Sequence, residues 1–255
     1  MGKTIITCVR HAQGYHNLST ANEQLPDPDL TPLGEAQCRT LSTVFPSPEN
    51  ITHLVASPLR RTLYTCLLSF PTAVARGLKV LALPELQETS SEPCDTGAAP
   101  AKLRAEFESG PFAGVVDFSL VQEGWNSKTG RWSPAKDAIK ARARDARLVL
   151  REIARSGDGH KEIIVVTHGA FLHYFSGDWD GSSLFHGTGW ANTEVRSYEF
   201  ADPSGMDQDA SLIETEESKM RRSVTEKPLT VAVEDNLRAV AGPNGGIQGV
   251  ETAKL

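Results

Sequence analysis

Two short runs of apolar, largely β-branched residues each lead into a histidine, and this pattern constrains the fold more than any other feature of the chain. Residues 4–9 run into Arg10 and His11, and residues 162–167 run into His168. Runs of this length and composition are typical of buried parallel strands. Because the carboxyl ends of parallel strands meet at one edge of a sheet, both histidines are expected at that edge.

Helical segments separate the strand-like ones through most of the first 200 residues. Thr31 and Pro32 open an amphipathic stretch, as an N-cap and a first helical residue would. The apolar spacing predicts helices at 31–45, 58–70 and 134–156 and from residue 170, and further strands at 53–56, 79–83 and 194–200. This alternation predicts an α/β fold: a three-layer sandwich with a mostly parallel central sheet and helices on both faces.

The alternation is interrupted once. Residues 89–134 are rich in Gly, Pro and Ser, contain Trp125 and Trp132, and offer only a short helix at 101–108. We expect either a cap over the strand ends or an irregular surface segment whose tryptophans pack on the domain. The expected organisation is a catalytic domain over 1–200 with this insertion, followed by an irregular or mobile tail over 201–255.

Charge argues against nucleic acid as a partner, and hydropathy argues against a membrane span. The formal net charge is −6, which does not favour nucleic-acid binding. The basic residues of the 134–156 helix alternate with acidic ones, which predicts a solvated helix face. These basic residues are Lys140, Arg142, Arg144, Arg147 and Arg151. The sequence contains no stretch of about 18 apolar residues, so it predicts no membrane span.

The four cysteines, Cys8, Cys38, Cys66 and Cys94, are widely spaced and form no Cys-x-x-Cys pair. This spacing favours reduced thiols over a disulfide framework or a zinc site. We therefore expect a cytoplasmic protein, with the nucleus as the alternative location.

Two arginines are expected close to the two strand-end histidines. Arg10 precedes His11, and Arg61 follows Ser57 and Pro58, which we expect to cap and open the 58–70 helix. A guanidinium matches phosphate oxygens with its planar fork of donors. A neutral imidazole offers a lone pair that can attack phosphorus. Together these residues predict a cationic pocket that binds and attacks a phosphoryl group.

The ordered segments Arg10-His11 with Asn17, Leu30-Thr31-Pro32-Leu33-Gly34, Ser57-Pro58-Leu59 with Arg61, Leu86-Gln87-Glu88 and Thr167-His168-Gly169 resemble the histidine phosphatase superfamily, in its phosphoglycerate mutase-like branch. The resemblance implies His11 as nucleophile and Glu88 as proton donor, with Glu85 as the alternative acid. It also implies a catalytic contribution from Arg10, Arg61 and His168. Arg10, Gln13, Asn17, Arg61 and His168 would bind the phosphoryl oxygens.

The resemblance implies a phosphatase that hydrolyses a small phosphorylated metabolite. The reaction would pass through a phosphohistidine on the enzyme and would need neither metal nor other cofactor. Ala12 stands where the family usually has glycine, which removes no functional group. A phosphoglycerate mutase-type phosphotransferase is one alternative, although residues 89–97 lack the Arg-rich, Tyr-Gly stretch of the mutases. A non-catalytic scaffold domain of the same fold is the other. The oligomeric state is left open by the sequence.

Overall fold

A central seven-stranded sheet forms the middle layer of the computed structural model, which describes residues 3–156, 159–179 and 189–221. The strand order is β4-β3-β2-β5-β1-β6-β7. Within it β6 and β7 run antiparallel to their neighbours, and the other pairings are parallel. The strands are β1 (Thr4–Arg10), β2 (His53–Ala56), β3 (Val80–Ala82), β4 (Val116–Asp117), β5 (Lys161–Thr167), β6 (Val195–Phe200) and β7 (Leu212–Glu214).

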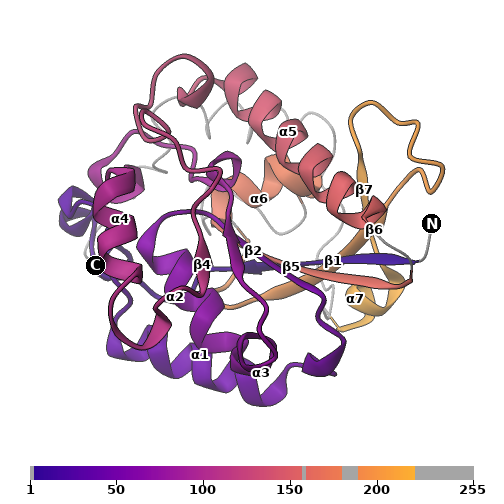
Figure 1. The fold of residues 1–255 in the computed structure, drawn as a ribbon. Coiled ribbons are helices and arrows are strands. Elements are labelled where there is room, and N and C mark those ends of the chain that lie inside the picture. The colour runs from indigo at the N-terminus through magenta and orange to yellow at the C-terminus, as the bar shows by residue number, and fades with distance from the viewer. Residues whose placement is uncertain (1–2, 157–158, 180–188, 222–255) are drawn as a thin grey trace, which may run out of the picture.

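Helices cover both faces of the sheet, so the expected three-layer α/β architecture is confirmed (Figure 1). The α-helices are α1 (Pro32–Val44), α2 (Arg60–Ser69), α3 (Pro71–Ala75), α4 (Pro100–Phe107), α5 (Lys136–Arg155), α6 (Gly169–Ser176) and α7 (Glu216–Arg221). Alternate residues of β5 divide between the two layers. Ile164 and Val166 pack in the core with α1, α2 and α4, whereas Ile163 and Val165 pack with α5 and α6. A strand buried on both faces needs this uninterrupted apolar run.

The inserted segment, residues 89–134, lies at the edge of the sheet and also adds a strand to it. Its strand β4 pairs in parallel with β3, and Leu103 of α4 lies in the core with the fully buried Trp125. The short helix expected at 101–108 is present as α4, and Trp125 packs on the domain as the second alternative expected, whereas the pairing of β4 with β3 was not expected. The two-residue strand β4 is too short to show a periodic pattern in the sequence.

Regular structure also continues past residue 200. Strand β7 pairs antiparallel with β6, and the backbone N–H of Thr215 donates to the carbonyl of Ser197 at 2.9 Å. The buried Ser218 of α7 donates to a carboxylate oxygen of Glu214 at 2.6 Å. Residues 212–221 are therefore not irregular. The sequence did not predict these two elements because β7 is only three residues long and α7 is shorter than two helical turns. The remainder of the expected tail, 222–255, lies outside the described residues.

The basic face of α5 is not the solvated surface expected from its charge pattern. Arg142 is 1% exposed and points into the domain, while Lys140 is exposed. Successive arginines of α5 donate to backbone carbonyls of the segment between β6 and β7. The donors and acceptors are Arg144 with Gln208, Arg147 with Asp209, Arg151 with Asp207 and Arg155 with Gly205. The helix thus uses its positive charge to fasten a loop of its own chain.

Two turns preceding helices place residues at the sheet edge. Thr31 caps α1 by accepting from the N–H of Gly34 at 3.0 Å. A Cβ on Gly34 would meet the carbonyl oxygen of Gln13 at 2.1 Å. Helix α2 begins at Arg60 with Leu59 as its N-cap, so the expectation that Ser57 caps a helix opening at Pro58 was wrong. Ser57 is instead free to face the strand ends.

We predict that Gly34→Ala destabilises the fold by about 2 kcal/mol, because the added methyl group must displace backbone rather than a flexible side chain. The free energy of unfolding in urea measures this effect. Glu35→Ala, at an exposed position of the same helix turn, is the matched control and should stay within about 0.5 kcal/mol of the wild type. A loss in Gly34→Ala no larger than in the control would contradict the prediction.

Candidate active site

His11 lies immediately beyond the end of β1 and is 2% exposed. Its N–H donates to the carbonyl of Thr167 at 2.9 Å, which ties it to the end of β5, and Asn192 donates to its carbonyl at 2.8 Å. The imidazole Nδ1 lies 2.7 Å from the carbonyl oxygen of Ala12. A carbonyl only accepts, so Nδ1 carries the proton and Nε2 keeps a lone pair.

The pKa of His11 lies well below its ordinary value. Burial is the main cause, and the charges of Arg61, His16 and Arg10 act in the same direction. The ring is therefore neutral at physiological pH. A neutral ring with a fixed tautomer is the form in which a histidine is nucleophilic.

His168 is fully buried just after β5, with its ring centroid 5.2 Å from that of His11. Its Nε2 lies 2.8 Å from Oγ of Ser57, which follows β2. Its Nδ1 has no hydrogen-bond partner among the described residues. The pKa of His168 is also well below its ordinary value, first through burial and then through Arg61. The expected meeting of both histidines at the strand ends is thus present.

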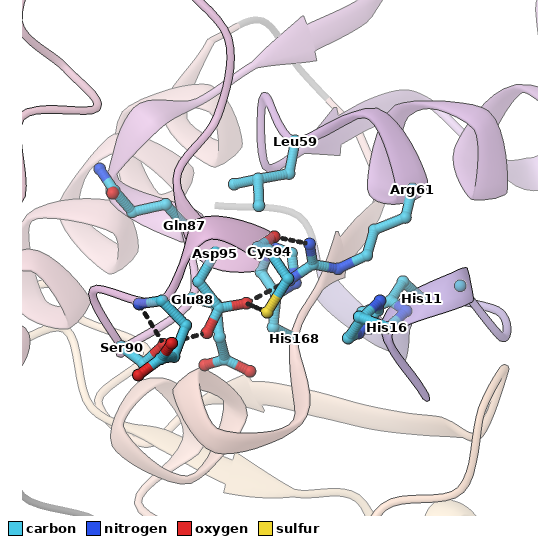
Figure 2. Close-up of polar contacts among 12 residues, drawn as sticks. His11, His16, Leu59, Arg61, Gln87, Glu88, Ser90, Cys94, Asp95 and His168 are labelled. Atoms are coloured by element: carbon cyan, nitrogen blue, oxygen red, sulfur yellow. Dashed lines mark hydrogen bonds and ion pairs between the residues drawn. The ribbon is translucent and has the colours of Figure 1, made fainter. Parts of the chain in front are cut away.

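Arg61 extends from the first turn of α2 towards residues of the inserted segment (Figure 2). It is 1% exposed, and it donates to the carbonyl of Cys94 at 2.5 Å and to the Asp95 carboxylate at 2.8 Å. Ser90 donates to the other oxygen of Asp95 at 2.5 Å. The guanidinium is therefore fixed by a buried ion pair. Sequence reasoning missed Ser90 and Asp95 because they lie in the aperiodic insertion.

Arg10 closes the same region from the end of β1. One of its terminal nitrogens donates to the carbonyl of Trp190. Burial lowers its pKa, and the nearby charge of Glu88 opposes that shift. The neighbouring Arg60 points elsewhere, because it pairs with Asp29 and Glu106 at 2.9 Å each.

Glu88 is the carboxyl group that the structure places with this cluster. Its oxygens accept from the N–H groups of Thr89, Ala170 and Phe171 at 2.8, 3.3 and 3.0 Å, the last two in the first turn of α6. Burial, and then the negative charge of Asp95, raise its pKa. Glu85 instead forms an ion pair with Arg131 at 2.8 Å. Of the two candidate acids, Glu88 is the one whose carboxylate contacts the first turn of α6, the helix that follows His168.

Backbone groups around Glu88 are held from α5 and β5. Arg142 donates to the carbonyls of Glu85 and Gln87 at 2.7 Å each, and Thr167 donates to that of Leu86 at 2.7 Å. Arg142 was assigned to the helix surface from sequence, so its part in the site was missed. The only feature of the sequence that could have indicated this role is the position of Arg142 on the apolar face of an amphipathic helix.

Gln13 and Asn17 order the loop after His11. The side-chain oxygen of Gln13 accepts from Thr31 at 2.8 Å, and that of Asn17 accepts from the N–H of Gly14 at 3.0 Å. The amide nitrogen of Asn17 lies 3.1 Å from Nε2 of His16, whose ring centroid is 5.3 Å from that of His11. The structure thus engages both side chains in the loop, and it adds His16, which the sequence did not single out.

Several buried polar atoms around His11 lack a partner among the described residues. They are Nε of Arg10, Nε of Arg61, Nδ1 of His16 and Nδ1 of His168. Because buried polar groups in folded proteins are nearly always hydrogen-bonded, a cluster of such atoms at the strand ends is suited to take up a polar ligand. Guanidinium and imidazole nitrogens of this sort suit an oxyanion. Within the part of the chain that is described, no group of three or more His, Cys, Asp or Glu side chains could hold a metal ion.

Comparison with known proteins places the chain in a family. Residues 6–205 match branch 1 of the histidine phosphatase superfamily, and the chain belongs to that superfamily. No protein of curated function matches the sequence. Membership of the superfamily, with this set of side chains, supports a phosphatase.

Solved structures show the same fold at low sequence identity. The ecdysone phosphate phosphatase of Bombix mori is 16% identical, with 77% of this chain and 89% of that chain covered and a TM-score of 0.55. Bacillus stearothermophilus YhfR is 15% identical, with 83% and 95% covered and a TM-score of 0.50.

We predict that Asp95→Asn lowers the pKa of Glu88, because it removes the negative charge that opposes ionisation of that carboxyl group. Carbon-13 NMR of the Glu88 carboxyl group across a pH titration measures the shift directly. The variant also breaks the buried pair with Arg61 and should lose about 3 kcal/mol of stability.

Glu123→Gln, an exposed position of the inserted segment, is the matched control and should leave the Glu88 titration in place. A Glu88 pKa in Asp95→Asn equal to that of the wild type would show that burial alone raises it.

Proposed function

We propose that the protein is a metal-independent phosphomonoester hydrolase that acts on a small phosphorylated metabolite through a phosphohistidine on His11. One observation carries the proposal: Nδ1 of the buried His11 is committed to the carbonyl of Ala12, so the lone pair of Nε2 is available. Nε of Arg10 and Nε of Arg61 have no partner among the described residues, and guanidinium N–H donors match the oxygens of a phosphoryl group.

The first step transfers the phosphoryl group. Nε2 of His11 attacks phosphorus, the bond between phosphorus and the ester oxygen breaks, and Glu88 gives its proton to the departing alcohol oxygen. Burial keeps Glu88 protonated to a higher pH than an ordinary glutamate, which suits this role. The N–H groups of Thr89, Ala170 and Phe171 then stabilise the carboxylate that remains.

The second step hydrolyses the phosphohistidine and regenerates the free enzyme. The Glu88 carboxylate takes a proton from water, the water oxygen bonds to phosphorus, and the bond between phosphorus and Nε2 breaks to release inorganic phosphate. Arg10, Arg61 and His168, with Gln13 and Asn17 from the loop after His11, are the proposed binders of the non-bridging oxygens. Their fixed positions would offset charge in both steps without reorganisation.

The remaining expectations about location and partners also stay proposals. We infer a cytoplasmic location from the four cysteines, which are all free and buried. The described residues include no helix that is long and apolar enough to cross a membrane. Nucleic acid is not a proposed partner, since the α5 arginines that could contact phosphates are occupied by the loop between β6 and β7.

We predict that His11→Ala lowers kcat/KM for phosphomonoesters by at least about a thousandfold, since the nucleophile is lost. Release of inorganic phosphate in the presence of EDTA measures turnover, and acid-quenched wild-type enzyme should carry an acid-labile, base-stable phosphoryl group. The exposed His160→Ala is the control and should retain full activity. Substantial activity in His11→Ala, or interconversion of 2- and 3-phosphoglycerate faster than phosphate release, would refute the proposed hydrolase.

We predict that Glu88→Gln slows hydrolysis of alkyl phosphates by roughly 100- to 10,000-fold and that of 4-nitrophenyl phosphate far less. The reason is that nitrophenolate departs without needing a proton. Glu85→Gln, three residues away and paired with the exposed Arg131, is the matched control and should show no dependence on the leaving group. Exchange of the two phenotypes would assign the acid to Glu85.

A further inference from the structure

The inserted segment places one lysine beside the proposed acid. Lys128 is half-buried and adopts φ +54°, a left-handed conformation that a residue other than glycine rarely takes. Its Nζ donates to the backbone carbonyl of Glu88 at 3.2 Å. Strained residues persist only where the surrounding structure fixes them, and they are frequent at functional sites.

Neighbouring residues hold this turn firmly against the site. The indole N–H of Trp125 donates to the carbonyl of Ala98 at 3.3 Å, and Asn126 donates to that of Gly97 at 2.6 Å. Gln87, adjacent to Glu88, donates to the carbonyl of Trp125 at 2.8 Å. The contacts of Trp125 and Asn126 therefore fix the turn that leads into Lys128.

The amine of Lys128 has capacity for a further partner. An ammonium group carries three N–H donors, and the carbonyl of Glu88 uses one. Within the part of the chain that the structure describes, no carboxylate lies within ion-pairing distance of Lys128. The Glu88 segment does not depend on it either, because Arg142 already donates to the carbonyls of Glu85 and Gln87.

The charge of Lys128 acts on the reacting groups. It contributes to the lowered pKa of His168, and Lys128 itself lies in the field of Asp95, Arg142, Glu88 and Arg61. Burial lowers the pKa of Lys128 to about 8, so the amine is mostly charged at neutral pH. The amine contacts the main chain of Glu88 and lies in the field of its carboxyl group, so a substituent on an alcohol that takes its proton from Glu88 would be within reach of the long lysine side chain.

We propose that Lys128 is a specificity-determining residue whose ammonium group binds a second anionic group on the leaving alcohol. The preferred substrates are then phosphomonoesters whose alcohol carries a carboxylate or a second phosphate close to the ester oxygen. This inference rests on the proposed hydrolase function, since it assigns the substrate class of the same site.

The experiment compares matched esters in the full-length protein. Phosphoglycolate carries a carboxylate, its carboxamide analogue is uncharged at the same place, ethylene glycol bisphosphate carries a second phosphate, and 4-nitrophenyl phosphate reports basal turnover. We expect kcat/KM of the wild type to favour phosphoglycolate or the bisphosphate over the carboxamide by on the order of tenfold. The ester that is favoured identifies the second anionic group.

Lys128→Met should abolish that preference, measured as the ratio of kcat/KM for the anionic ester to kcat/KM for the carboxamide, and Lys128→Arg should restore part of it. Lys102→Met, at an exposed position of α4 in the same segment, is the control and should keep the preference. In the wild type the preference should fall as the pH rises through about 8, because the amine loses its proton there.

The outcomes separate the two proposals. Hydrolysis of 4-nitrophenyl phosphate with no preference for an anionic ester would overturn the role of Lys128 and leave the hydrolase standing. An equal loss on all esters in Lys128→Met would also overturn it, since the lysine would then only position Glu88. No hydrolysis of any ester by the wild type would overturn the proposed function itself.

Discussion

The parallel register of β1 against β5 is the constraint on which the site depends. Arg10 pairs with Thr167 at the last position of the ladder, so the residues that follow, His11 and His168, leave the sheet side by side. A one-residue slip would exchange the two faces of the strand and separate the imidazoles from their partners. Backbone hydrogen bonds at the strand ends hold this register, from the N–H of His11 to the carbonyl of Thr167 and from the N–H of Ser57 to that of Val166.

Charged neighbours then act on the pKa values of His11 and Glu88 in opposite directions. Arg10 and Arg61 disfavour protonation of His11, whereas Asp95 disfavours ionisation of Glu88. The same Asp95 carboxylate fixes the Arg61 guanidinium, so one residue of the insertion influences both the proposed anion-binding group and the proposed acid. The proposed catalytic set is therefore completed by a segment that belongs neither to the strands nor to the helices carrying the histidines.

Periodic elements and the residues on them could be predicted from sequence, whereas residues in aperiodic segments could not. The strand β2 and the strand-end positions of His11 and His168 follow from apolar runs and the topology they imply. Asp95 and Lys128 lie in turns whose conformation depends on contacts with distant residues such as Arg61 and Gln87. Arg142 was misplaced because charge pattern alone cannot distinguish an arginine that reaches buried carbonyls from one in water.

The contacts between α5 and the loop that joins β6 to β7 have an evolutionary consequence. The arginines bond to main-chain oxygens at positions 205 and 207–209, and every amino acid supplies such an oxygen. Two side chains of the loop add to this: the Asp209 carboxylate pairs with Arg144 at 3.0 Å, and the Asp207 carboxylate accepts from the N–H groups of Asp209 and Ser211 at 2.9 and 2.7 Å. Gln208 meets α5 through its main-chain oxygen, so that position is free to vary in sequence while the path of the loop stays fixed.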